Sequence, residues 1–212
     1  MHTPDGFLHP WMAVAFIIAS GGVLAYAARK LRGTVTPRQT QLFGMVTASI
    51  FAAQMLNWPL PGGVSAHFVG GALAAIVLGP YLGALSVALV VAVQALVFAD
   101  GGVLALGANV WNMAIVQVFG GYAVYRVASA YHESGAIVLA GWASITLAAL
   151  AAGIQLGLSP AFGSELISVV TVMAGGHAVL GVGEALLTLV GVRLVDRLDA
   201  VDSETVEGGV AA

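Results

Sequence analysis

Apolar residues run along this chain in seven long stretches, separated by short connections that are polar or rich in glycine and proline. The stretches cover residues 9–29, 39–57, 67–79, 81–99, 107–129, 134–157 and 165–197. A helix that crosses the hydrocarbon core of a bilayer needs about 20 mostly apolar residues. The pattern therefore predicts an all-α membrane protein with about seven transmembrane helices.

Two of these stretches depart from a simple span. The third is short, and Gly79-Pro80 predicts that its helix ends sharply there. The seventh is too long for one simple span, and Gly175-Gly176 is a candidate hinge or break within it.

Composition supports the membrane assignment. Hydrophobic residues make up 59% of the 212 residues and charged residues only 8%, against about 25% charged residues in a typical soluble domain. These numbers exclude an ordinary globular enzyme and a disordered chain, and a net charge of −3 without a basic stripe excludes a nucleic-acid binder. Cysteine is absent, which excludes disulfide, iron–sulfur and thiol chemistry. We expect one transmembrane domain over 1–198 and a short, frayed acidic cytoplasmic tail over 199–212.

All seven basic residues fall on one side of the membrane if seven helices alternate in direction. They are Arg29, Lys30, Arg32, Arg38, Arg126, Arg193 and Arg197. The positive-inside rule then places the N-terminus outside and the C-terminus in the cytoplasm. The outer side carries Asp5, Asp100 and Glu165 without Lys or Arg, and an acidic mouth favours cations.

The N-terminus has the chemistry of a metal chelate. No basic residue precedes Arg29, so the start does not resemble a signal peptide. Because His2 is large, we expect Met1 to be retained with a free amine. That amine, the His2 amide nitrogen and the His2 Nδ1 atom can close a five- and a six-membered ring on one ion, and Pro4 can stiffen the turn. A fourth nitrogen would complete a square-planar site, which favours Ni(II) or Cu(II) and allows Co(II).

The fourth ligand must come from another part of the chain. His132 lies in an expected cytoplasmic loop, and His9 begins the first helix. His67 follows the Gly/Pro-rich residues 58–66 and begins the short third stretch at the depth of the N-terminus, so we choose it. Such irregular backbone is tolerated in a membrane where it lines a protein-enclosed site. The alternative is that His2 is only exposed and that His67 caps a helix, and the spacing alone does not decide between these readings.

Several polar residues are candidates for orienting the metal ligands. Asp5, Ser65, Gln94 and Asn109 are placed near the outer ends of their segments, where they can hold the free ring nitrogen of a ligating histidine. The alternative is ordinary hydrogen bonding between helices. For Asp100–Gly102 a tight glycine turn is favoured over a metal ligand.

Two further patterns concern the helices. Gly44, Ala48 and Ala52 form a stripe of small residues, which fits either close packing inside the bundle or docking on a helix of a partner. His177 and Glu184 are seven residues apart and share one helical face. For Glu184 we favour a structural pair or a part in subunit coupling over a metal ligand.

The opening residues resemble those of the CbiM/NikM family, the substrate-binding (S) components of energy-coupling-factor (ECF) transporters for cobalt and nickel. The resemblance extends over nearly the whole chain. It is carried by Met1–Trp11, Ser65–Gly71, Leu78–Pro80, Gln94–Gly102, Leu106–Asn109 with Asn112-Met113, and His177–Ala185. An ordered series of this kind is far more specific than any one of its pieces.

The resemblance implies a seven-helix bundle in the cell membrane with the N-terminus tucked into a substrate cavity. It implies Ni(II) or Co(II) as the transported ion, bound by the Met1 amine, the His2 amide nitrogen, the His2 imidazole and the His67 imidazole. The implied partners are a transmembrane coupling (T) subunit, two ATPase subunits and often a small accessory membrane protein. The chain has no phosphate-binding loop of its own, so ATP hydrolysis is expected in separate subunits and no catalytic residue is expected here.

Two other functions are weighed against this one. A stand-alone secondary metal carrier would have acidic or histidine motifs such as HxxxxDH within its helices, and none is present. An intramembrane serine hydrolase would need a nucleophile with a base, but Ser20 has no evident partner in the sequence and there is no GxSG motif. Nickel and cobalt are not distinguished, although the opening is slightly more similar to the nickel type.

Overall fold

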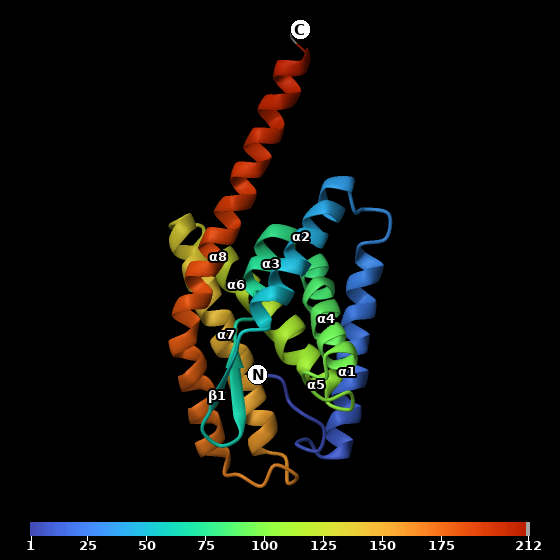
Figure 1. Ribbon diagram of the computed structural model, residues 1–212, viewed down its shortest axis with the longest axis vertical. Helices are drawn as coiled ribbons and strands as arrows, with labels where there is room; N and C mark the ends of the chain where they lie inside the picture. Colours follow the sequence, from blue (N-terminus) through green and yellow to red (C-terminus); the bar gives the residue numbers. More distant parts are fainter. Residues whose placement is uncertain (211–212) are drawn as a thin grey trace.

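The computed structural model describes the backbone of residues 1–210 and the side chains of residues 1–200. Within this range the chain forms seven helical units, as the hydropathy pattern predicts, arranged as one bundle (Figure 1). The units are α1 (Pro10–Lys30), α2 (Pro37–Gln54), α3 (Gly71–Leu78), α4 (Pro80–Val97), a continuous segment of α5 (Leu106–Val110), the π-helix η1 (Trp111–Val116) and α6 (Gln117–Ala128), α7 (Glu133–Gly157), and α8 (Leu166–Val210).

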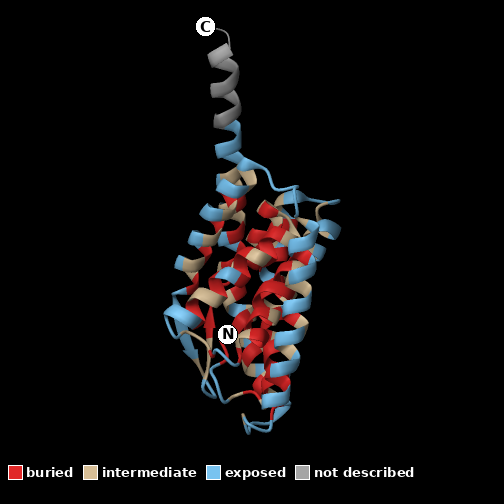
Figure 2. Cartoon of the chain, turned by 90° about the vertical axis from the view of Figure 1, so that its right-hand side faces the viewer, coloured by how far each residue is buried: buried red, intermediate tan, exposed pale blue. Residues whose placement is uncertain are grey.

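The bundle has the surface of a multi-pass membrane protein. Helices α1, α4, α7 and α8 are long and apolar enough to cross a membrane. Large apolar side chains such as Ile18, Val97 and Val179 are more than two-thirds exposed on the outside, which suits contact with lipid rather than water. The buried residues gather at the centre, around α3 and α4 (Figure 2).

The chain between α2 and α3 forms a β-hairpin that the sequence did not predict. Strands β1 (Asn57–Leu60) and β2 (Val64–His67) pair in antiparallel register, with Asn57 opposite His67. Gly62 and Gly63 make the turn with φ of 82° and 79°, which glycine adopts at little cost. Pairing between the strands satisfies backbone groups that membrane lipid cannot satisfy.

The position expected for His67 is corrected by this hairpin. His67 ends strand β2 instead of starting a helix, and α3 begins only at Gly71. Gly70 between them has φ of 76°, a left-handed conformation that ends the strand and turns the chain. At eight residues, α3 is about 12 Å long and is enclosed by the other helices, so the hairpin and α3 together fill one place in the bundle.

The break expected at Gly175-Gly176 is wrong, because α8 continues through both residues. Gly176 instead allows a close approach, since a Cβ atom there would lie 2.8 Å from Leu60 of the hairpin. Helix α8 also continues to Val210, so the helix does not end where the apolar stretch ends. The domain boundary at 198/199 stays a prediction, and residues 211–212 of the expected tail lie outside the described residues.

The basic residues gather at one end of the bundle, at the top of Figure 1. Arg38 of α2 binds the carboxylate of Asp199 in α8. Arg193 of α8 donates to Ser134 in the first turn of α7. The basic residues that predict the orientation therefore form one surface of the fold. The orientation across the membrane stays a prediction.

Candidate metal centre

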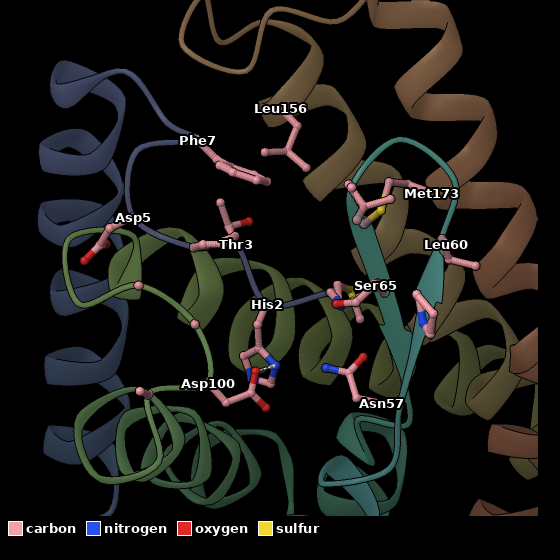
Figure 3. Close-up of a pocket in the computed structure, with 18 residues that line it drawn as sticks. His2, Thr3, Asp5, Phe7, Asn57, Leu60, Ser65, Asp100, Leu156 and Met173 are labelled. Atoms are coloured by element: carbon pink, nitrogen blue, oxygen red, sulfur yellow. Dashed lines mark hydrogen bonds and ion pairs between the residues drawn. The ribbon is translucent and has the colours of Figure 1, made fainter.

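The segment before α1 threads into the bundle. Met1 and His2 are buried, with exposed fractions of 2% and 8%. They lie in a cavity of about 730 Å³ between the β-hairpin, the loop 99–102 and helices α7 and α8 (Figure 3). The N-terminus therefore reaches the interior, as the resemblance implies.

The terminal amine is held by Ser65 of strand β2. It lies 2.6 Å from the Ser65 carbonyl oxygen and 3.0 Å from the hydroxyl oxygen. Burial lowers the pKa of the Met1 amine to about 4, although the nearby Asp100 carboxylate opposes the shift. At neutral pH the amine is therefore uncharged, with a lone pair available for a metal ion.

The His2 ring is fixed by Gln94 of α4. Its Nε2 atom lies 3.1 Å from Gln94 Oε1, so Nε2–H donates and Nδ1 carries the lone pair. Nδ1 is buried without a hydrogen-bond partner, and Asp100 Oδ1 lies 3.4 Å from it. Burial lowers the pKa of His2 to about 3, so this contact joins two electron-rich atoms at neutral pH and is not an ion pair. A cation beside them would stabilise the arrangement.

His67 has the complementary arrangement. Its Nδ1–H donates to the Phe68 carbonyl oxygen at 2.7 Å, which leaves Nε2 with the lone pair. Nε2 is buried and has no partner. The His67 and His2 rings stack with centroids 4.4 Å apart and an interplanar angle of 15°. Two unpaired imidazole nitrogens thus lie beside an uncharged amine.

Residues Thr3 and Asp5 anchor the N-terminal segment. Asn109 accepts from the Thr3 amide at 2.8 Å and donates to the Thr3 carbonyl at 3.0 Å, and the Gly102 amide donates to the same carbonyl. The Asp5 carboxylate accepts from the amides of residues 103–105. The loop before α5 and the N-terminal segment therefore hold each other in place.

The four residues expected to orient the ligands all lie at the cavity or border it, but with different contacts. Only Gln94 bonds a histidine ring. Ser65 holds the amine, whereas Asn109 and Asp5 hold the main chain. The role of Thr3 was not predicted, because nothing in one sequence pairs its main chain with a side chain 106 positions away.

Glu184 of α8 clamps the chain that follows His67. Its carboxylate accepts from the Val69 amide at 3.1 Å, the Gly70 amide at 2.6 Å and Gln117 Nε2 at 3.1 Å. Gln54 of α2 donates to the Val69 carbonyl at 2.9 Å. Helices α8 and α2 thus bond residues 69–70 directly, while Gln117 of α6 holds the Glu184 carboxylate. Together they fix the Phe68 carbonyl that sets the His67 tautomer. The expected pairing of Glu184 with neighbouring helices is present, and its partners are the hairpin exit and α6.

The stripe of small residues lies away from this centre. Gly44, Ala48 and Ala52 are exposed on the outer face of α2, and a Cβ atom at Gly44 would meet nothing within 4 Å. The stripe is therefore open rather than packed inside the bundle, and docking of a partner helix on it stays a prediction.

The donor set limits the metals that fit. Among the side chains of residues 1–200, no three His, Cys, Asp or Glu lie close enough together to hold an ion. The further nitrogen donors at this centre are those of the chain end, the Met1 amine and the His2 amide, and with imidazole they make the donor set of a chelate at a free N-terminus. Nitrogen donors in one plane favour Ni(II) or Cu(II) over Mg(II) or Ca(II).

Comparison with known families gives one match over nearly the whole chain. The family model described as "CbiM: Cobalt uptake substrate-specific transmembrane region" matches residues 2–200.

Similar proteins carry related names. A putative fused nickel transport protein, NikMN, from Archaeoglobus fulgidus is 53% identical over 100% of this chain and 71% of its own length. A putative metal transport protein from Haloquadratum walsbyi is 52% identical over 89% of this chain and 86% of its own. The cobalt transport protein CbiM from Acetoanaerobium sticklandii is 32% identical over 90% of this chain and 82% of its own.

The fold is also similar to a solved structure. A crystal structure of a transition metal transporter superposes with a TM-score of 0.89 at 34% identity, and the match covers 94% of each chain.

Proposed function

Since the chain belongs to the CbiM family of cobalt uptake substrate-specific transmembrane regions, we propose that it is the substrate-binding component of an ECF-type ABC transporter that imports Ni(II) or Co(II). The ion is bound by the Met1 amine, the His2 amide nitrogen, His2 Nδ1 and His67 Nε2. A transmembrane T subunit, two ATPase subunits and, in some assemblies, a small accessory membrane protein complete the transporter.

The observation that carries this proposal is the pair of unpaired ring nitrogens. His2 Nδ1 and His67 Nε2 are buried without partners, and their rings stack beside the terminal amine. Buried polar atoms are normally hydrogen-bonded, so two such lone pairs at one place indicate a ligand. The other nitrogen of each ring already donates to Gln94 or Phe68, which is the arrangement that orients histidines toward a metal.

The charges at the centre suit a divalent cation. Binding through the His2 amide nitrogen requires loss of its proton, which gives one negative charge, and Asp100 supplies a second beside His2. Together these neutralise M²⁺ inside a buried site, where an unpaired charge would be costly. The order of stability puts Ni(II) above Co(II) for nitrogen donors, so the chemistry favours nickel without excluding cobalt as the physiological ion.

The test is a titration of the purified full chain, with its native N-terminus, by Ni(II) and Co(II). A variant with one extra residue before Met1 replaces the amine by an amide and cannot fit against Ser65. We expect one ion per native chain and at least about a hundredfold loss of affinity in the extended chain, the scale of effects at metal sites. Equal binding by both chains would refute the chelate.

Two single substitutions complete the titration. His67→Ala removes the fourth nitrogen and should weaken binding by a similar factor. His132→Asn is the matched control, because His132 caps α7 at the basic end of the bundle by accepting from the Gly135 amide, and asparagine can replace the cap. It should bind metal like the native chain.

The source of energy needs a separate experiment. We expect lipid vesicles that contain the chain alone to accumulate no Ni(II), and vesicles that also contain the T and ATPase subunits to accumulate it when ATP is supplied. Uptake by the chain alone, driven by an ion gradient, would favour a secondary carrier.

A further inference from the structure

His177 of α8 is a third buried histidine with an unused lone pair. Its side chain is fully buried, and its Nδ1–H donates to the Met173 carbonyl oxygen at 2.8 Å. Its Nε2 atom has no partner. His67 has the same hydrogen-bond arrangement, in which a main-chain carbonyl oxygen fixes the tautomer and leaves Nε2 free. His177 is not among the four nitrogen donors proposed for the bound ion.

The packing of α8 on the hairpin places His177 beside the metal centre. A Cβ atom at Gly176 would contact Leu60 of β1, and one at Gly183 would contact Phe68 just after β2. Leu60 pairs with Val64, so β2 runs along α8 between the levels of Gly176 and Gly183. His177 lies in this interval on the buried face.

The surroundings of His177 agree with this placement. Met173, one helical turn earlier, lines the cavity that contains Met1 (Figure 3). The terminal amine and the His67 ring are both close enough to interact electrostatically with the His177 ring. His177 lies one helical turn beyond Met173 along α8, toward the end that carries Arg193.

We propose that His177 Nε2 is a transit ligand that receives Ni(II) or Co(II) together with His67 when the N-terminal chelate opens. This inference rests on the proposed function, because it presumes that the chelate holds the ion first. In this step the metal–nitrogen bonds to the Met1 amine, the His2 amide and the His2 ring break. The amide nitrogen takes up one proton from water, and the hydroxide that is left is neutralised by the solvent buffer. The bond to His67 persists and a bond to His177 Nε2 forms. The ion never leaves nitrogen donors entirely, which keeps the barrier to its movement low.

The test uses the chain with one extra residue before Met1, in which the chelate is blocked but His67 and His177 remain. Co(II) is the probe. We expect weak binding of one ion, reduced at least tenfold by His177→Gln and by His67→Ala, and unchanged by the control His132→Asn. No binding by the blocked chain, or binding that His177→Gln leaves unchanged, would overturn the proposal.

A measurement without substitution of His177 guards against misfolding of that variant. In the blocked chain labelled with ¹⁵N-histidine, paramagnetic Co(II) should give large contact shifts to the Nδ1–H signals of His67 and His177, the two coordinated rings. The His2 ring stacks on His67 and should show only the smaller through-space shift of its Nε2–H signal. Large contact shifts for one histidine only would contradict the proposal. Tight Ni(II) binding by the native chain is measured in parallel, and its absence would refute the proposed function rather than this inference alone.

Discussion

The carboxylate of Glu184 should control both the stability of the bundle and the position of His67. The change Glu184→Gln keeps the size of the side chain but replaces one acceptor oxygen by an NH₂ group. In the best arrangement the remaining oxygen still accepts from the Gly70 amide and Gln117, as Oε1 does now. The NH₂ group then faces the Val69 amide, which at present donates to Oε2.

The magnitude follows from that one lost bond. Leaving the buried Val69 amide without its acceptor costs about 1–3 kcal/mol, and more when the lost acceptor is charged. We expect Glu184→Gln to lower the free energy of unfolding by roughly 2–4 kcal/mol. For a chain of this size that corresponds to roughly 5–15 °C in Tm. Because residues 69–70 support the Phe68 carbonyl that orients His67, the affinity for Ni(II) should fall as well, by about tenfold.

The assay is thermal unfolding of the purified chain in detergent, followed by Ni(II) titration below the transition. Thr188→Val is the matched control on the same face of α8, because it removes only a hydroxyl that donates to the Glu184 carbonyl within the helix. It should cost less than about 1 kcal/mol. An equal Tm change in both variants would refute the idea that the Glu184 carboxylate holds residues 69–70 in place. A lower Tm with native Ni(II) affinity would show that these hydrogen bonds stabilise the bundle without orienting His67.

Two further predictions concern the N-terminal segment. Gly102→Ala should weaken Ni(II) binding at least tenfold, because its Cβ atom would overlap Asp5, whereas Gly22→Ala, which meets nothing within 4 Å, should bind like the native chain in the same titration. Calorimetry of Ni(II) binding at pH 7 in buffers of different ionisation enthalpy should show release of about one proton, from the His2 amide, since the Met1 amine and the His2 ring, with pKa values of about 4 and 3, are already unprotonated. Release near two protons would mean that the amine is still protonated in the folded chain. Because the folded pKa of this amine lies below its unfolded value of 8.0, the unfolded state binds more protons between these values, and docking of the segment should weaken as the pH falls from 8 toward 4.

The hydropathy pattern was sufficient for the long helices. The stretch 9–29 corresponds to α1 and 134–157 to α7 within one residue at each end, because apolar runs flanked by charge or proline have few alternatives in a membrane. The stretch 107–129 was also located correctly, but its π-helical turn was not predicted, since a single inserted residue leaves no mark on average hydropathy.

The hairpin and the anchoring contacts could not be predicted in the same way. Residues 57–67 are too short and too mixed to show a strand period, and their Pro and Gly residues indicated only irregular chain. His2 and His67 were found from chemistry and resemblance, not from contact. The bonds that join Thr3 to Asn109 and His2 to Gln94 span about half the chain. They depend on how α4 and α5 pack, and no local sequence pattern predicts that packing.

The anchored N-terminal segment also has a kinetic consequence. Thr3 and Asp5 are held by six hydrogen bonds from Asn109, Gly102 and residues 103–105. For an ion held by the proposed donors, the donors of Met1 and His2 can withdraw only when this segment opens locally. The residence time of the ion is then set by the opening rate of a peptide segment rather than by ligand exchange at the metal. Any event that separates the loop before α5 from the segment before α1 would shorten that time without changing a single metal ligand.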